Sequence, residues 1–331
     1  MSLMTANNTS CHLVTFFIGV TEVCFMEAPV GQCNYCCPRN DALDIQYKLF
    51  TRINPRNFQI IPPGNSRALM RTNFNSADPT IIYLMGFSEA VTGVSTTTLR
   101  DAFLLRGNYN FIAVDWSRLI VFPWYVSAVR NVRYMGTRLA EFVMFLDASG
   151  IEASTLHIIG FSLGAEAAGF AGKHLRARGL LLGRITGLDP AYPGYSLTNS
   201  NDHLAKGDAA FVDVLHTNPG VFGFPLPIGD VDFYPNPGKW IQPGCWVDQL
   251  IKNRELGLIF GCSHNRAWRL YAESIRNPGG FPATLCRNWK GSSRRCQPQI
   301  HGYMGYGASP PSAGKMYLET NDKSPYARNA L

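Results

Sequence analysis

The segment Gly160-Phe161-Ser162-Leu163-Gly164 has the residue types and spacing of a serine nucleophile. A G-x-S-x-G sequence between an apolar run and a small-residue helix places the serine on a tight turn with its oxygen exposed. The flanking glycines lack the Cβ atoms that would collide with the strand and the helix, and the helix dipole favours oxyanion charge at this turn. A chance match in an ordinary strand–turn–helix is the alternative. The flanking context predicts Ser162 as the nucleophile of a hydrolase.

The acid of such a site should follow the serine along the chain and precede the histidine. A serine hydroxyl reacts when a histidine takes its proton and a carboxylate holds that histidine. Asp189 fits this role because it directly follows the apolar run ITGL and precedes Pro190. An Asx turn or a helix N-cap is its alternative role. Asp208 and Asp213 compete, but one precedes a predicted strand and the other lies within it, so we predict Asp189.

Seven histidines are candidates for the base. His264 is favoured because it opens a predicted helix just after Cys262, where a covalent link would fix its backbone. His203, His216 and His301 remain alternatives. His216 ends an apolar strand, a position typical of a histidine buried in the core.

The elements that must position these residues alternate along the chain. Apolar runs predict strands at 80–86, 111–115, 156–160, 184–189 and 210–216, and helical spacing or small residues predict helices at 132–149, from the serine to about 178, and at 264–275. This alternation indicates an α/β fold with a mostly parallel sheet. Before residue 80 the pattern favours antiparallel edge strands. The C-terminal 30 residues favour surface coil with one edge strand, Lys315 to Glu319.

Composition excludes several classes of protein. Of the 331 residues, 46% are hydrophobic and 16% are charged, and the net charge is +7. The basic residues are scattered rather than arranged in a stripe, which argues against nucleic-acid binding. A weak attraction to anionic lipid surfaces suits this charge better. Because no apolar run approaches the roughly 20 residues of a membrane-spanning helix, we expect no such helix.

Nine cysteines lie near the two ends of the chain. This clustering favours disulfides between cysteines that are close in sequence, and hence a secreted, extracellular protein. Zinc at Cys33-x-x-Cys36-Cys37 is the alternative, but no second ligand pair lies nearby. Residues 1–21 contain an apolar stretch of the length found in signal peptides, without the usual basic residues before it. No linker divides residues 22–331, which we expect to form one domain.

Seven segments, in order along the chain, resemble the pancreatic-lipase-like (animal neutral lipase) family, especially its insect lipase and phospholipase A1 members. They are MGF at 85–87, AVDW at 113–116, GFSLGAEAAGFAG at 160–172, ITGLDPAYP at 185–193, VDVLHTN at 212–218, DVDFYPN at 230–236 and CSHNRAWRLYAESI at 262–275. The resemblance implies an α/β-hydrolase fold and a triad of Ser162, Asp189 and His264. It also implies an oxyanion hole made by the backbone N–H groups of Phe87 and Leu163.

The same resemblance implies a lid over the active site. In this family a disulfide matching Cys245–Cys262 closes the lid, here residues 245–262, and Cys286–Cys296 would link a separate loop. An amphipathic lid hides an apolar cleft in water and exposes it at a lipid surface. A helical hairpin packed permanently on the body is the alternative. Because the sequence stops at Leu331, we expect neither a C-terminal β-sandwich nor a colipase partner.

The family resemblance also argues against a metal site. Family members that hold calcium do so between the catalytic acid and the VDVLHT-like strand. The corresponding positions here are Ser200, His203, Ala205 and Asp208, of which only Asp208 is retained. We therefore expect no metal and no other cofactor.

The residues leave three functions open. The favoured one is hydrolysis of carboxylic esters in lipids, either triacylglycerols or phospholipids at sn-1, with a phospholipase A1 or galactolipase as the narrower alternative. A non-catalytic lipid-binding protein, like the yolk proteins of this family, is disfavoured because all three triad positions are present. A soluble esterase for short acyl esters would share the chemistry and differ only in the cleft.

Overall fold

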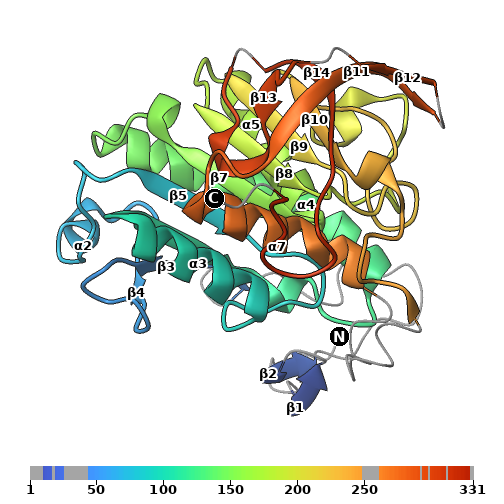
Figure 1. The fold of residues 1–331 in the computed structure, drawn as a ribbon. Coiled ribbons are helices and arrows are strands. Elements are labelled where there is room, and N and C mark those ends of the chain that lie inside the picture. Colours follow the sequence, from blue (N-terminus) through green and yellow to red (C-terminus); the bar gives the residue numbers. More distant parts are fainter. Residues whose placement is uncertain are drawn as a thin grey trace.

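The structure, a computed structural model, describes residues 10–16, 19–25, 44–247, 261–290, 293–296, 299–310 and 312–328. Within these ranges a 12-stranded sheet forms the centre of the molecule (Figure 1). Its middle strands run parallel in the order β6 (Asn110–Asp115), β5 (Thr80–Leu84), β7 (His157–Phe161), β8 (Arg184–Leu188), β9 (Phe211–Leu215), β10 (Val231–Pro235) and β14 (Gly314–Leu318). The predicted α/β class with a mostly parallel sheet is confirmed.

Antiparallel strands extend the sheet at both ends. They are β3 (Gln46–Phe50) and β4 (Gln59–Ile60) beyond β6, and β11 (Pro282–Lys290), β12 (Ser293–Cys296) and β13 (Gly302–Tyr303) beyond β14. The prediction of an edge strand near residue 315 is wrong in one respect, because β14 lies inside the sheet between β10 and β11. Met316 and Leu318 are accordingly buried. A separate pair, β1 (Ser10–Phe16) and β2 (Gly19–Phe25), sets Cys11 opposite Cys24.

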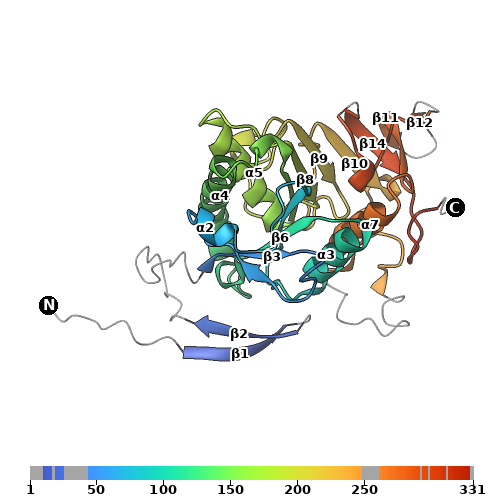
Figure 2. The same ribbon diagram turned by 90° about the vertical axis from the view of Figure 1, so that its left-hand side faces the viewer.

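Helices cover both faces of the sheet (Figure 2). On one face lie α4 (Tyr125–Ala148) and α5 (Leu163–Arg176), and on the other lie α3 (Val94–Arg106) and α7 (Cys262–Arg276). The shorter elements are α2 (Ser66–Leu69) and the 3₁₀ turns η1 (Ser117–Leu119), η2 (Ala153–Thr155), η3 (Ser200–Asp202), η4 (Asn236–Gly238) and η6 (Gly305–Gly307). None of the described helices combines the length and the apolar character needed to cross a bilayer.

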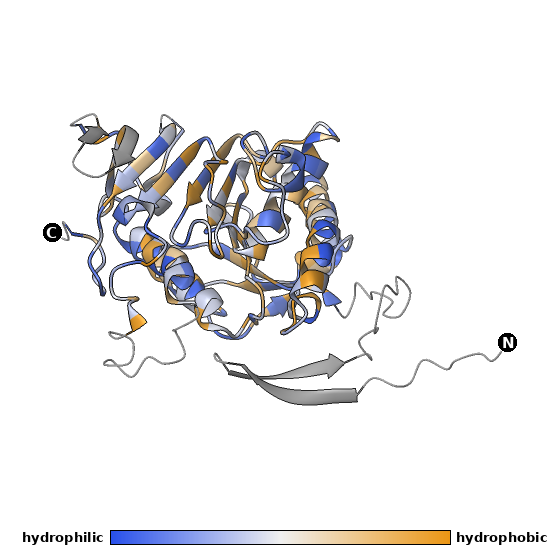
Figure 3. Ribbon diagram, turned by 90° about the vertical axis from the view of Figure 1, so that its right-hand side faces the viewer, coloured by the Kyte–Doolittle hydropathy of each residue, from blue (hydrophilic) through white to orange (hydrophobic). Residues whose placement is uncertain are grey.

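This two-sided cover explains why the central strands read as continuous apolar runs. All five residues of β5 and all five of β7 are buried, as expected of parallel strands with helices on both faces. Figure 3 shows apolar residues along strands of the central sheet. Small residues bring α5 close to the sheet: a Cβ atom on Gly164 would lie 2.3 Å from the carbonyl oxygen of Leu84 at the end of β5. The turn that enters α5 is therefore held at the carboxyl edge of the sheet.

Candidate active site

Ser162 occupies a strained turn between β7 and α5. Its backbone has φ 54° and ψ −121°, a conformation that residues other than glycine rarely adopt. The turn is held by hydrogen bonds from the Ser162 N–H to the Leu188 carbonyl (3.0 Å) and from the Ala165 N–H to the Ser162 carbonyl (3.0 Å). Strain of this kind is maintained where it sets the direction of a functional side chain.

Glycines surround this turn because the backbone segments meet too closely for side chains. A Cβ atom on Gly160 would lie 2.3 Å from the Gly164 carbonyl oxygen, and one on Gly164 would lie 2.3 Å from the Leu84 carbonyl oxygen. The positions two residues before and two residues after the serine must therefore be glycine. On the neighbouring loop after β5, a Cβ atom on Gly86 would lie 3.0 Å from the Ser162 Cβ. The loop that starts at Gly86 is therefore packed directly against the serine side chain.

Asp189 follows β8 and is fully buried. One carboxylate oxygen, Oδ1, accepts hydrogen bonds from the backbone N–H groups of Thr217 (2.8 Å) and Asn218 (3.0 Å). The other, Oδ2, lies 2.6 Å from Nδ1 of His264. A carboxylate oxygen accepts from an imidazole N–H, so Asp189 holds the proton of His264 on Nδ1 and leaves Nε2 available as a base.

Gly223 is a site residue that the sequence analysis missed. A Cβ atom at this position would lie 2.3 Å from Oδ1 of Asp189. Only glycine lets the loop after β9 close over the carboxylate. Nothing in the local sequence of this glycine-containing loop indicates the contact, because Asp189 is distant along the chain.

His264 lies in the first turn of α7, two residues after Cys262. Its ring is 4.6 Å from the ring of Phe161, which directly precedes the serine, and 5.7 Å from the ring of Phe222. The imidazole therefore lies over the turn that carries Ser162. Among the described residues, Nε2 has no hydrogen-bond partner. The structure thus brings the three predicted triad residues to one edge of the sheet.

The two predicted oxyanion donors adjoin the serine from different elements. Leu163 is the first residue of α5, directly after Ser162, and Phe87 follows the Gly86 that packs on the serine. Neither backbone N–H donates to an acceptor within the described part of the chain. Free N–H groups beside a nucleophile are the arrangement that stabilises the oxyanion of a tetrahedral intermediate.

The competing acids are committed elsewhere. Asp208 accepts hydrogen bonds from Lys173 and from the Ala205 N–H. Asp213 pairs with Arg184 and accepts from the hydroxyl of Thr186. Neither acid has a hydrogen bond to a histidine among the described residues, which leaves Asp189 as the acid that faces the proposed base.

The competing histidines have other partners as well. Nδ1 of His203 lies 2.6 Å from the Leu204 carbonyl, and His301 lies beside the Leu285 N–H at the far end of the sheet. His216 lies between a carbonyl and Asp232 in the core, as its position at the end of an apolar strand indicates.

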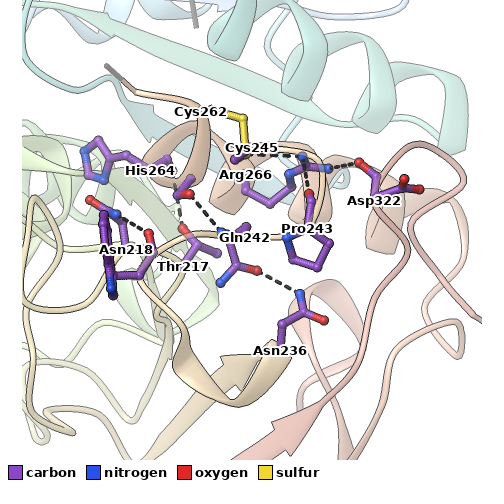
Figure 4. The surroundings of a disulfide bond; sticks show 12 residues. Thr217, Asn218, Asn236, Gln242, Pro243, Cys245, Cys262, His264, Arg266 and Asp322 are labelled. Atoms are coloured by element: carbon purple, nitrogen blue, oxygen red, sulfur yellow. Dashed lines mark hydrogen bonds between the residues drawn. A yellow bond between two sulfur atoms is a disulfide. The ribbon is translucent and has the colours of Figure 1, made fainter. Parts of the chain in front are cut away.

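A disulfide between Cys245 and Cys262 fixes the start of α7 (Figure 4). Arg266 supports it by donating to the Pro243 and Asp322 carbonyls and to Sγ of Cys245. The second predicted disulfide, Cys286–Cys296, joins β11 to β12. The lid predicted between Cys245 and Cys262 lies for the most part outside the described residues, since 248–260 are not described.

The positions that correspond to the family's calcium ligands do not fit a metal. Nζ of Lys173 donates to Asp208 and to the His203 carbonyl (2.7 Å), so an ammonium group already lies at the remaining acid. Burial raises the pKa of Asp208 and lowers that of Lys173, and the charge of each group opposes the shift of the other. No group of three or more metal-ligating side chains occurs in the described ranges.

Sequence comparisons give consistent matches. A family model described as Lipase matches residues 28–326. The chain is 34% identical to human pancreatic triacylglycerol lipase over 86% of its length, and 33% identical to the guinea pig (Cavia porcellus) enzyme over 87%. It is 36% identical over 76% of its length to bovine (Bos taurus) phospholipase A1 member A. The chain spans 65%, 66% and 53% of these relatives, respectively.

Similar solved structures include an α/β-superfamily hydrolase from Xanthomonas campestris pv. campestris, with 14% identity and a TM-score of 0.31 over 60% of this chain and 98% of that one. Aspergillus fumigatus lipase B has 12% identity and a TM-score of 0.35 over 50% of this chain and 45% of that one.

Proposed function

The chain belongs to the lipase family, and from that premise we propose that it hydrolyses carboxylic ester bonds of lipids with Ser162, His264 and Asp189. The observation that carries the proposal is the 2.6 Å contact between His264 Nδ1 and Asp189 Oδ2. Nε2 of the same ring lies above the Ser162 turn and has no hydrogen-bond partner among the described residues. This arrangement supplies an activated nucleophile, a base and an orienting carboxylate in one place.

The reaction would proceed through an acyl-enzyme. Ser162 Oγ attacks the ester carbonyl carbon while His264 Nε2 takes the hydroxyl proton. The carbonyl oxygen becomes an oxyanion, which the N–H groups of Phe87 and Leu163 bind, each contributing about 3 kcal/mol to the transition state. His264 then passes its proton to the leaving alcohol. Water, deprotonated by the same nitrogen, attacks the acyl-enzyme and releases the fatty acid.

Apolar side chains around the site support a lipid substrate. Large apolar residues that are 40–59% exposed follow the carboxyl ends of the parallel strands: Phe122 and Trp124 after β6, Leu197 after β8, Phe222 and Leu226 after β9, and Trp240 and Trp246 after β10. Exposed apolar groups gathered at one edge of a sheet are typical of contact with lipid or with an apolar ligand. The net charge of +7 would add attraction to anionic lipid surfaces.

Triacylglycerol and phospholipid are both candidate substrates, because relatives named for each activity match the chain. The test is to assay the purified protein on triolein and phosphatidylcholine emulsions side by side. A short p-nitrophenyl ester, assayed below and above its aggregation concentration, separates a lipase from a soluble esterase. We expect long-chain turnover, a rate rise at aggregation, and loss of both in Ser162→Ala. Turnover confined to the monomeric short ester would contradict the lipid assignment.

We also propose that the protein is secreted and acts without calcium. The two disulfides support an oxidising compartment, and the Lys173 ammonium at Asp208 takes the place of a cation in this loop. Treatment with EDTA should leave activity and melting temperature unchanged, and Lys173→Met should lower the melting temperature. A loss of activity in EDTA that added calcium restores would contradict this reading.

A further inference from the structure

A turn formed by residues 86–89 connects β5 to the site and is held by Glu89. The Glu89 carboxyl oxygen Oε2 accepts the Gly86 N–H at 2.8 Å, and the Glu89 N–H donates to the Gly86 carbonyl at 3.2 Å. A single residue therefore fixes both backbone groups of Gly86.

The hydrogen bonds between Glu89 and Gly86 set the direction of the Phe87 N–H group. In a trans peptide the C=O and the N–H point to opposite sides. Because the Gly86 carbonyl points to the Glu89 N–H, the Phe87 N–H of the same peptide points away from it. Ser88, at φ 63°, closes the turn, and its N–H donates to the Ile120 carbonyl at 2.8 Å.

The peptide that carries the Phe87 N–H lies against the nucleophile, since a Cβ atom on Gly86 would lie 3.0 Å from the Ser162 Cβ. We propose that Glu89 is a positioning residue that holds the Phe87 N–H in place as an oxyanion donor. The inference rests on the proposed esterase function and adds to it a residue outside the triad.

The surroundings of Glu89 are unusual for a carboxyl group with a structural role alone. Its side chain is 7% exposed, and it forms no salt bridge with any described residue. Burial raises its pKa, while the Gly86 N–H, the Ser95 hydroxyl and the nearby His264 act in the opposite direction. A buried acid that forms no salt bridge is costly to folding. That cost is understandable if the acid organises the site.

Glu273 on α7 provides a matched comparison. It is also 7% exposed, but its carboxylate accepts the backbone N–H groups of Tyr326 and Ala327 and so ties the C-terminal segment to the helix. Glu273 therefore stabilises a long-range contact, whereas Glu89 fixes a four-residue turn beside the serine.

The test uses the full chain and compares Glu89→Ala, Glu89→Gln and Glu89→Asp with Glu273→Ala. Glutamine keeps the reach and an acceptor oxygen, whereas aspartate keeps the charge and loses the reach. Rates on p-nitrophenyl butyrate are normalised to active sites titrated with a fluorophosphonate, and melting temperatures are recorded. We expect Glu89→Ala to lower kcat about 10- to 100-fold with KM within about twofold. This is less than the roughly 10²- to 10³-fold cost of removing an oxyanion donor, because the Phe87 N–H is displaced rather than removed.

The inference is tested by the order of the kcat values of the variants. Glu89→Gln should stay within about fivefold of wild type and above Glu89→Asp, and Glu273→Ala should melt earlier with unchanged kcat per site. Wild-type kcat in Glu89→Ala, or a Glu89→Asp variant more active than Glu89→Gln, would overturn it. If Glu89→Ala does not fold, the order of the other two decides. A wild-type protein inert to the ester and the fluorophosphonate would instead refute the proposed function.

Discussion

Two histidine–aspartate pairs in the described part of the chain, each with a buried carboxylate, differ in what the second ring nitrogen of the histidine can do. His264 lies 2.6 Å from Asp189, and His216 lies 2.8 Å from Asp232. In both pairs the carboxylate also accepts backbone N–H groups, from Thr217 to Asp189 and from residues of the loop before β10 to Asp232. By distance and burial of the acid alone, the two pairs are equivalent.

The two pairs differ in the contacts of the second ring nitrogen of each histidine. Nδ1 of His216 lies 2.9 Å from the Phe224 carbonyl while Nε2 faces Asp232, and the ring stacks on Tyr234 at 4.5 Å. Both ring nitrogens therefore face acceptor groups, and neither is free to take a proton from a serine hydroxyl. His264 keeps Nε2 unpartnered among the described residues. A base is therefore recognised by its uncommitted nitrogen rather than by its carboxylate.

Substituting each histidine by glutamine should show the difference between the two pairs most clearly. His264→Gln removes the base, and we expect kcat to fall by about 10⁴-fold or more with little change in stability. His216→Gln should keep kcat per active site within about tenfold but cost about 3 kcal/mol of unfolding free energy, because Asp232 stays buried without its partner. Kinetics and urea denaturation check both. Equal losses of kcat would show that the two pairs have similar roles.

Gly223→Ala should disturb only the catalytic pair. The new Cβ would lie 2.3 Å from Oδ1 of Asp189, so the loop or the carboxylate must move. We expect kcat to fall about 100-fold, in line with small misplacements of catalytic groups. Gly279→Ala is the control, since no atom lies within 4 Å of its Cβ position. Unchanged kcat in Gly223→Ala would argue that Asp189 does not orient the base.

The two disulfides should differ in the same way. Replacing both Cys245 and Cys262 by serine removes a 17-residue link worth about 3 kcal/mol and frees the start of α7, two residues before His264. We expect a lower melting temperature and a fall in kcat of about tenfold. The matched double replacement of Cys286 and Cys296 should lower stability alone. If kcat fell by the same factor in both double variants, the effect on activity would not come from the anchoring of His264 by the Cys245–Cys262 disulfide.

His157, a buried histidine outside both pairs, extends the comparison to the effect of pH. Nε2 of His157 lies 2.8 Å from the Thr186 hydroxyl, which itself donates to Asp213, so the ring donates from Nε2. Burial, aided by the charge of Arg184, lowers its pKa well below the ordinary 6.5. As the pH falls below the ordinary 6.5, His157 binds a proton in the unfolded chain but not in the folded chain. The stability of the folded protein therefore falls as the pH falls.

Urea denaturation between pH 7.5 and 4.5 checks this prediction. The stability of His157→Gln should fall less steeply than that of wild type, by up to about 1.4 kcal/mol per pH unit. Parallel curves for the two proteins would mean that His157 takes up its proton in the folded state as well.

Local signals predict Ser162 as the nucleophile and Asp189 as the acid, whereas the other assignments depend on contacts between segments that are distant along the chain. Ser162 and Asp189 stand at strand ends with their motifs around them. The roles of Gly223 and Glu89 depend on which atoms meet them in three dimensions, and no pattern in their own loops reports that. The choice among His203, His216 and His264 likewise needed the partner of each ring nitrogen.

The fold was predictable where a strand or helix buries a periodic face. The predicted strand starts and ends agree with β5 to β9 within one or two residues. The helix predicted from 132 begins at Tyr125, because Ala128 is buried and the Tyr125 hydroxyl donates to the Pro193 carbonyl. The C-terminal 30 residues are rich in glycine, proline and serine, which predicts surface coil with an edge strand, whereas β11 pairs with β14 on its outer side.

Covalent labelling of the nucleophile tests the central claim most directly. The protein is treated with a fluorophosphonate and digested, and the modified peptide is identified by mass spectrometry. We predict one adduct per chain, on Ser162, present in His216→Gln and absent in Ser162→Ala and His264→Gln. An adduct on another residue, or ester turnover that persists in Ser162→Ala, would contradict the account.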